Sequence, residues 1–471
     1  MKKYIYIVIS AFAAMSLAGC SDFLTEKPVM SLTDELAQET LQDMDNNVAG
    51  AYALLSSSTW YSSNFILSNE MKSPNGMKVL GTGDHGYFHD DYNIQYTPQS
   101  TSPLWGTAYG LIDAVNRSIA KLPDMGKPEE VDNMLAEAYF LRALAHFDLV
   151  RTYALPYRST ADHSHLGVPL ILKQQSLEDK PERNTVKDVY DQIIRDLRKA
   201  EELIDPAYQR KGTDPYAYAS LPVIQALLSR VYLYSEHWQE SANYAAKVIK
   251  NGKYKLWTAD NLKDAKCYRE DVPKAGGEII FEFFDSPSND SRSNIFDMAT
   301  KDGAYGDASC AEYTLALYED ADVRKGLFAS KDGKTWSLKY AGKGLGKPDY
   351  NNVVVLRLSE MYLNIAEACL KPGVTAPEGL NGEDCLKAIT DSRGASQQPY
   401  TLKSVFRERE REFAWEAHSW FDYARTGETM IRESYVGPDN NKTLEKDDLR
   451  WAMPIPNREI IVNPNIKQNK Y

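Results

Sequence analysis

The chain has 471 residues, enough for one large domain or for two to three ordinary ones. Its composition, 43% hydrophobic and 25% charged, is that of a folded protein. The formal net charge of −12 argues against nucleic-acid binding, which requires a basic surface, and against electrostatic docking on anionic lipid. The 30 tyrosines suit wet binding surfaces as well as cores, because each ring has an apolar face and a polar tip.

The first segment has the features of an export signal. A basic Lys-Lys pair precedes an apolar run over 4–17, which is too short to span a bilayer. The run ends in Leu-Ala-Gly-Cys, which resembles the lipobox of bacterial lipoproteins, with Cys20 as the lipidated first residue of the mature protein. We therefore expect a signal peptide over 1–19 and a tether over 20–40 that is anchored to a membrane by its acyl chains.

Helical periodicity dominates the rest of the chain. It predicts helices over 35–57, 103–122, 128–152, 185–204, 218–234, 238–250, 353–371, 382–392 and 402–425. The segment 128–152 is apolar almost all round, so we expect it to be deeply buried. The run EIIFEFF at 278–284 is a possible strand.

The segment 225–254 indicates how neighbouring helices pair. It predicts one helix, a turn at 235–237, and a second helix that stops at an Asn-Gly pair. Large and small residues lie near the positions at which one helix of a tetratricopeptide unit packs on the next. These residues are Leu228, Tyr232, Trp238, Ser241 and Ala242.

Three regions lack helical periodicity. Residues 59–102 and 255–350 are rich in Gly, Ser, Asn and Asp with interspersed aromatic residues, and 153–184 holds three prolines. Loops of this length in a compact protein are usually functional or disordered, so we look for ligand contacts there.

A run of six alternating arginines and glutamates fills 407–412. It is open to three interpretations: an acid–base cluster, a binding surface, or a helix with one solvated face. We favour the helix, with opposite charges paired at i,i+3 on its exposed side. Pairing with other helices, such as the one that carries Arg357, Glu360 and Glu367, is the alternative. The sequence offers no role for His418.

Eight segments in order resemble the SusD/RagB-like family of surface glycan-binding lipoproteins, and together they cover nearly the whole chain. They are CSDFLTEKP (20–28), LWGTAYGLIDAVN (104–116), AEAYFLRALAHFDLVRTYALPY with GVPLIL (136–172), NTVKDVYDQIIRDLRKAEEL (184–203), the helix pair 225–254, VLRLSEMYLNIAEAC (355–369), FREREREFAWEAHSWFD (406–422) and PIPNREIIVNPNIKQN (454–469). The chain departs from the family pattern at Ala154 and at 417–419, where the usual Gly and Gly-x-Arg are missing, and at 468–471, which read Gln-Asn-Lys-Tyr rather than Gln-Asn-Pro-Gly-Tyr.

The resemblance implies a mainly α fold, in which tetratricopeptide-like helix pairs form a right-handed superhelix with a large, irregular loop-rich face and little β structure. On this basis 41–471 is a single domain with loop insertions at about 59–102 and 255–350. The resemblance also implies a binding protein without catalysis or cofactor. Its partner would be a SusC-like TonB-dependent transporter in the outer membrane, to which it delivers glycan while its lipid anchor keeps it at the cell surface.

Ligand contacts cannot be transferred from family motifs, so we select them by chemistry. Sugars need flat apolar faces and polar groups for their hydroxyls. The first irregular region supplies His85, Tyr87, Phe88, Asp90 and Tyr92. The second supplies Asn289, Arg292, Trp336, Lys339 and Tyr340. The competing interpretation is that these side chains pin the loops to the scaffold.

Other chemistries have weaker support. His163 and His165 lack a third ligand nearby, and neither Asp90-Asp91 nor Asp320-Asp322 has EF-hand spacing, so we predict no metal site. The cysteines at 267, 310, 369 and 385 match no zinc pattern. A peptide-capturing relative stays an alternative, as does a lipid-anchored glycan hydrolase, although no local context singles out a carboxylate pair for hydrolysis.

Overall fold

Helices dominate the computed structural model, and its strands occur in pairs. The described residues are 40–79, 84–97, 103–176, 178–211, 214–269, 274, 276–283, 295–340, 342 and 352–470. The predicted signal peptide, the tether up to residue 39 with Cys20, and the predicted ligand contacts Asn289 and Arg292 therefore lie outside the described residues.

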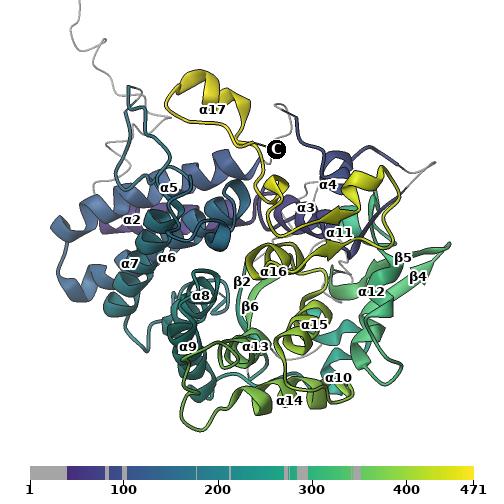
Figure 1. Cartoon of the computed structure of the whole chain (residues 1–471). Coiled ribbons are helices and arrows are strands. Elements are labelled where there is room, and N and C mark those ends of the chain that lie inside the picture. The colour runs from purple at the N-terminus through teal and green to yellow at the C-terminus, as the bar shows by residue number, and fades with distance from the viewer. Residues whose placement is uncertain are drawn as a thin grey trace, which may run out of the picture.

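A series of longer helices forms the scaffold on the left and lower part of Figure 1. They are α2 (Leu41–Leu55), α5 (Leu104–Lys121), α6 (Pro128–Tyr153), α7 (Val186–Leu203), α8 (Leu221–Tyr234), α9 (Trp238–Lys250), α13 (Leu358–Ala368) and α14 (Gly382–Arg393). Consecutive helices pack as neighbours: α5 on α6, α6 on α7, α8 on α9, and α13 on α14. The predicted mainly helical fold with paired helices is confirmed.

The helix α6 is deeply buried, as its apolar sequence predicts. Helices α2, α5 and α7 all pack against it, and most of its residues from Leu135 onward are buried. Arg142, in its middle, forms a bidentate ion pair with Asp196 of α7, with N···O distances of 2.7 and 2.8 Å. A buried arginine with such a planar partner fixes the register of one helix on the next.

Short polar residues and glycines define the ends of these helices. The Thr40 side chain accepts a hydrogen bond from the Asp43 amide at the start of α2, and Thr185 does the same for Asp188 in α7. Gly394 ends α14 with a φ of +67°, and a side chain there would approach the Ala321 carbonyl to 2.9 Å.

The helix predicted over 353–371 begins five residues late, because its first part is a strand. Residues Val353–Arg357 form β6, which pairs antiparallel with β2 (Ile279–Phe283), the strand predicted from EIIFEFF. The consecutive valines explain the difference, since β-branched side chains favour extended backbone. The β2–β6 pair packs against α8, so it joins the irregular region to the scaffold.

The single helix predicted over 402–425 is wrong, because two helices occupy this segment. They are α15 (Leu402–Phe413) and α16 (Ser419–Thr426). Between them Trp415 and Ala417 have left-handed φ values of +66° and +58°, which a right-handed helix cannot accommodate. Strained backbone of this kind persists only where surrounding contacts hold it.

Three buried side chains hold that turn. Glu70 accepts a hydrogen bond from the Ala417 amide at 2.7 Å, Lys339 Nζ donates to the Ala414 carbonyl at 2.8 Å, and the Tyr340 hydroxyl donates to the Trp415 carbonyl at 2.5 Å. Lys339 and Tyr340 are only 1% and 3% exposed. Their prediction as ligand contacts is therefore wrong, because both side chains are buried and hydrogen-bonded to the backbone of the turn.

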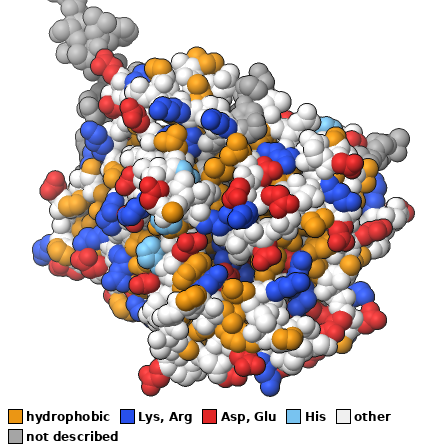
Figure 2. Space-filling view, in the orientation of Figure 1, with side chains coloured by type: hydrophobic (Ala, Val, Ile, Leu, Met, Phe, Trp, Pro, Cys, Tyr) orange, Lys and Arg blue, Asp and Glu red, His pale blue; other side chains and the backbone are white. Residues whose placement is uncertain are grey.

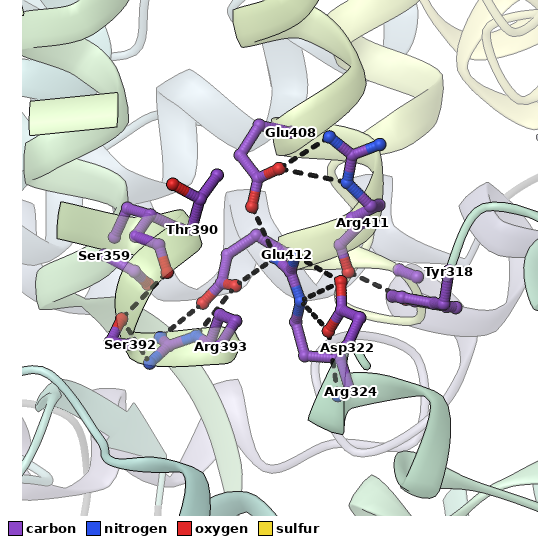
Figure 3. Close-up of polar contacts among 12 residues, drawn as sticks. Tyr318, Asp322, Arg324, Ser359, Thr390, Ser392, Arg393, Glu408, Arg411 and Glu412 are labelled. Carbon is purple, nitrogen blue, oxygen red and sulfur yellow. Dashed lines mark hydrogen bonds and ion pairs between the residues drawn. The ribbon is translucent and has the colours of Figure 1, made fainter. Parts of the chain in front are cut away.

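The charged run at 407–412 is buried to a large extent, contrary to the predicted solvated face. Figure 3 shows Arg324 and Arg393 converging on the carboxylates of α15. Arg324 bridges Asp322, Glu408 and Glu412 at 2.7–2.8 Å. Glu412, 3% exposed, also receives Arg393 at 2.7 Å and an ion pair from Arg357. The alternative, pairing with the chain around Arg357, is confirmed.

The pairs expected within this helix form only in part. Arg407–Glu410 and Glu408–Arg411 are ion pairs at i,i+3. Arg409 turns instead to Asp422 of α16, at 2.9 Å.

His418 now has a structural place. Its ring stacks on Phe413 at a centroid distance of 4.3 Å, and Arg230 lies 3.5 Å from Nε2. Burial and the surrounding arginines lower the pKa of His418 well below its ordinary value, so the ring is neutral.

Short elements form the irregular face at the right and top of Figure 1. The strand pairs are β1 (Gly76–Lys78) with β3 (Ala308–Cys310), β4 (Phe328–Lys331) with β5 (Lys334–Ser337), and β7 (Met430–Ile431) with β8 (Thr443–Leu444). The short helices are α3 (Asn64–Lys72), α4 (His89–Asn93), α10 (Ala259–Leu262), α11 (Ile295–Ala299), α12 (Glu312–Ala316) and α17 (Asn457–Val462). The region 59–102 is thus not all surface loop, because α3 is almost wholly buried.

Three further observations concern the described part of the chain. None of its helices is both long and apolar enough to cross a membrane. The cysteines at 267, 310, 369 and 385 are free thiols; Cys369 is half-buried and the other three are buried. Acidic and basic side chains are interspersed over the face seen in Figure 2.

Candidate functional site

An exposed aromatic cluster lies where the loop before α4 meets the loop before β3. Tyr87 is 41% exposed, and its ring meets that of Tyr305 edge to face at 5.3 Å. The His85 ring meets the same tyrosine at 5.2 Å, with an interplanar angle of 85°. We call these three side chains the aromatic platform. His85 and Tyr87 were predicted as ligand contacts; Tyr305 was missed.

Asp307 organises the platform from beneath. Its carboxylate accepts the His85 Nδ1–H at 2.6 Å, the His85 amide at 3.1 Å and the Tyr87 amide at 3.3 Å. The acceptor is 1% exposed, whereas the His85 side chain is 42% exposed. A buried carboxylate that receives several N–H groups fixes both the loop backbone and the orientation of the His85 ring.

The β1–β3 ladder brings the two loops of the platform together. Lys78 lies opposite Ala308 in its register, and the Val79 amide donates to the Asp307 carbonyl at 3.2 Å. The position of Tyr305 is fixed in turn by its own amide, which donates to the Asp297 carbonyl at 3.0 Å. The platform therefore rests on a paired strand and on α11, and this gives it a defined geometry.

Trp336 supports the platform rather than forming part of it. It is 7% exposed and sits on β5, opposite Ala329 of β4. Its indole nitrogen would lie 3.9 Å from a side chain added at Gly306, the residue after Tyr305. The prediction of Trp336 as a direct contact is therefore wrong, because its side chain is buried.

Tyr92 is likewise an interior residue. It is 2% exposed, and its hydroxyl accepts the Val436 amide at 2.9 Å. The Arg432 guanidinium lies against both the Tyr92 and Tyr435 rings, 4.8 and 4.3 Å from their centroids. Tyr92 thus attaches α4 to the segment before β8, and its prediction as a ligand contact is wrong.

Polar groups surround the exposed part of the platform. Phe88 is half-buried with a left-handed φ of +55°, and Asp90 is exposed at the start of α4. Lys78 Nζ lies 2.8 Å from His89 Nδ1 and 3.0 Å from the Asp84 carboxylate. The Lys78 hydrogen bond lowers the pKa of Asp84 below its ordinary value. This arrangement offers an apolar ring flanked by donors and acceptors, without a nucleophile activated by a base.

The two histidines considered for a metal are used otherwise. His163 Nδ1 donates to the Tyr157 carbonyl at 2.8 Å, and His165 Nε2 donates to the Leu155 carbonyl at 3.1 Å. The described residues contain no group of three side chains that could hold a metal ion.

Comparisons with known proteins identify the family. A family profile described as "Starch-binding associating with outer membrane" matches residues 22–233, and one described as "SusD family" matches 334–471. A SusD-like protein of Formosa agariphila is 23% identical over 530 residues, covering 100% of this chain and 99% of the relative. A SusD-like protein of Bacteroides ovatus is 23% identical over 561 residues, covering 98% and 97%.

Solved structures agree with the profiles. A putative sugar-binding protein from Bacteroides vulgatus superposes with a TM-score of 0.82 at 25% identity, covering 92% of this chain and 98% of that one. A SusD superfamily protein from Bacteroides thetaiotaomicron gives 0.80 at 27% identity, covering 92% and 100%. With profiles matching both ends and relatives matching along its length, this chain belongs to the SusD family.

Proposed function

We propose that this protein binds oligosaccharide or polysaccharide at the outer membrane, and that the aromatic platform is its contact surface. The observation that carries the proposal is the exposed Tyr87 ring, held against Tyr305 on a rigid frame anchored by Asp307. The profile that matches the N-terminal half is described as starch-binding, and a structural relative is described as sugar-binding, in agreement with this surface.

The chemistry of the platform suits a sugar ring. The C–H face of a pyranose packs on an exposed tyrosine ring, while neighbouring polar groups exchange hydrogen bonds with its hydroxyls. His85, two residues before Tyr87, and Asp90, three residues after it, supply polar groups from the same loop, and the Phe88 ring lies 6.5 Å from that of Tyr87. Asn289 and Arg292 stay predicted contacts.

The proposal includes the membrane and the partner. Cys20 carries the lipid anchor, and a SusC-like TonB-dependent transporter receives the glycan. Tethering both proteins to one membrane raises the effective concentration of the binder at the transporter to about the millimolar range. Replacement of Cys20 by Ala should release the protein from the membrane fraction; retention of the variant there would contradict the anchor.

Isothermal titration calorimetry with a panel of glycans tests the binding site. Tyr87→Ala and Tyr305→Ala should each weaken binding of a recognised glycan by about tenfold, the loss expected for one stacking ring. Ile461→Ala on α17 is the control, because it removes a large apolar side chain that is 73% exposed elsewhere. Unchanged affinity in both tyrosine variants would exclude the platform as the glycan-binding surface.

The two alternatives give different results in the same assay. A peptide-capturing protein would bind an oligopeptide mixture and none of the glycans. A hydrolase would release shorter products from a bound glycan, which chromatography of the titrated sample would reveal.

A further inference from the structure

A small pocket lies between the C-terminal end of α6 and the helix α16, and it shares no residue with the aromatic platform. Aromatic rings and two arginines form much of its wall, among them Tyr190, Tyr234, Phe421, Arg151 and Arg425. It leaves about 20 Å³ for the centre of a water-sized sphere. This space fits one water molecule or one monatomic ion, and it is too small for a phosphate group or a sugar ring.

Arg151 has one guanidinium nitrogen that no other residue engages. Its side chain is 7% exposed, and Nε and Nη2 donate to the Asp148 carboxylate at 2.9 and 2.6 Å. The rings of Phe65, Phe147 and Phe421 hold the guanidinium in place, with centroids 4.4–4.8 Å away. Nη1 has no hydrogen-bond partner in the part of the chain that the structure describes. It is therefore the nitrogen available to a ligand in the pocket.

Two other buried arginines have acceptors at both ends of the guanidinium group. Arg324 donates from Nε and Nη2 to Asp322 and from Nη1 to Glu408, at 2.7–2.9 Å. Arg142 likewise donates from all three nitrogens. A buried N–H group without an acceptor is costly, so we expect a further acceptor at Arg151 Nη1.

Two tyrosine hydroxyls add donors to the same pocket. Tyr190 of α7 and Tyr234 of α8 line it and are 4% and 5% exposed. Neither hydroxyl has a hydrogen-bond partner among the described residues. Burial raises the pKa of Tyr190, the neighbouring Tyr234 adds to the rise, and Arg151 opposes it, so the three groups lie within electrostatic reach of one another. Both phenols stay protonated and can donate.

The pairs that Arg151 and Arg425 form turn their cations towards the pocket. Arg425 donates from Nε to Asp422 and from Nη1 and Nη2 to Glu367, at 2.6–2.7 Å. The residues that line the pocket, all within the described part of the chain, include no aspartate or glutamate. The partner carboxylates thus lie behind the guanidinium groups. Dipoles oriented in this way, together with N–H and O–H donors, favour an anion over a neutral water molecule.

We propose that this pocket binds a chloride ion through Arg151 Nη1 and the hydroxyls of Tyr190 and Tyr234. A single open guanidinium nitrogen gives a monodentate contact, which suits a monatomic anion, whereas arginine binds carboxylate and phosphate groups most strongly through two nitrogens. The ion joins the scaffold helices to α16, which contributes Phe421 and Arg425 to the same pocket. This inference does not depend on the proposed glycan binding.

Crystals of the protein soaked in sodium bromide test the site directly, because bromide replaces chloride and scatters anomalously. The expected result is an anomalous difference peak within hydrogen-bond distance of Arg151 Nη1 and of both tyrosine hydroxyls. A water molecule in the pocket, in crystals that show bromide peaks elsewhere, would overturn the proposal.

Thermal unfolding tests whether chloride is bound in solution. At constant ionic strength, replacement of sodium gluconate by sodium chloride should raise the Tm by about 2 °C, because the ion binds only the folded protein. The concentration dependence of the Tm gives the chloride affinity. An equal Tm in the two salts would contradict binding.

Two conservative variants assign the effect to the pocket. Tyr234→Phe and Tyr190→Phe each remove one donor and keep the ring, so each should weaken chloride binding by about tenfold. The matched control is Tyr362→Phe on α13, a half-buried tyrosine outside the pocket whose hydroxyl likewise has no hydrogen-bond partner in the described chain. It should keep the chloride dependence of the wild type. The same dependence in all four proteins would place any bound chloride elsewhere and refute the assignment.

Discussion

The Asp307 carboxylate accepts the His85 Nδ1–H at 2.6 Å, although the two residues are 222 positions apart in the chain. The same carboxylate accepts the Tyr87 amide, so one buried side chain sets the position of two exposed rings. The platform is therefore preorganised before any ligand arrives, and this lowers the entropy lost on binding.

Removal of the Asp307 carboxylate should weaken glycan binding more than removal of an exposed side chain does. Asp307→Ala takes away the acceptor of three N–H groups, so the loop before α4 loses its fixed place. We expect about tenfold weaker glycan binding by calorimetry. Asp307→Asn keeps one acceptor oxygen, so its affinity for glycan should lie between those of the wild type and the Ala variant. Equal affinity in the wild type and the Ala variant would show that Asp307 does not position the platform.

Gly306, the residue after Tyr305, gives a second test of whether the platform is rigid. Gly306 has a φ of +61°, and a side chain there would lie 3.4 Å from the Thr300 carbonyl oxygen. Gly306→Ala should cost about 1–2 kcal/mol of unfolding free energy and should also weaken glycan binding, because Tyr305 is the preceding residue. The control is Gly326→Ala, since a side chain at Gly326 meets no atom within 4 Å. Equal melting temperatures for the two variants would contradict the strain argument.

Glu412 carries the strongest stability prediction. It is shared by Arg324, Arg357 and Arg393, all nearly inaccessible to solvent. Glu412→Gln keeps the shape but leaves three buried cations short of an anion, so we expect a loss of about 3–5 kcal/mol in urea denaturation. The exposed Glu433 serves as control in Glu433→Gln. A loss below about 1 kcal/mol, the usual limit for a solvated pair, would refute the buried network.

Glu70 should make stability depend on pH. Burial raises its pKa from the ordinary value of 4.5 to about 7, although the Asn75 and Ala417 hydrogen bonds oppose the shift. Between these values the folded protein retains a proton that the unfolded chain has lost, so the contribution of Glu70 to stability falls as pH rises through this window.

Glu70→Gln removes that titration. The unfolding free energy of the variant, relative to the wild type, should rise by about 2–3 kcal/mol between pH 5 and pH 8. The Asn75 amide loses an acceptor oxygen in this variant, which changes the unfolding free energy by an amount that does not vary with pH. Parallel pH profiles for the two proteins would show that the carboxyl group of Glu70 does not titrate in this range.

Local sequence was sufficient to predict the helical scaffold. The periodicity over 128–152 and 238–250 matches α6 and α9 closely, and EIIFEFF matches β2. These signals are local because burial of one helix face imposes a 3.6-residue repeat wherever the helix packs. Two interruptions of the predicted helices could not be predicted from local periodicity. The strand before α13 and the left-handed residues between α15 and α16 depend on partners distant in the chain.

The candidate site was predicted only in part for the same reason. Residues 85–92 were found because aromatic and polar residues cluster there, but composition does not distinguish the exposed Tyr87 from the buried Tyr92. Tyr305 and Asp307 lie in an inconspicuous stretch and become visible only through the β1–β3 register. Lys339 and Tyr340 look like ligand contacts until their acceptors in 414–416 are known.

The sequence by itself determined the family pattern and the order of helices, since each depends on residues that are close along the chain. The tertiary structure decided which charges are solvated and which rings are open to a ligand. The run at 407–412 has the alternation of a solvated helix, yet Arg324, Arg357 and Arg393 converge on it from other elements. Burial is a property of the residues that surround a side chain, and most of those come from elsewhere in the chain.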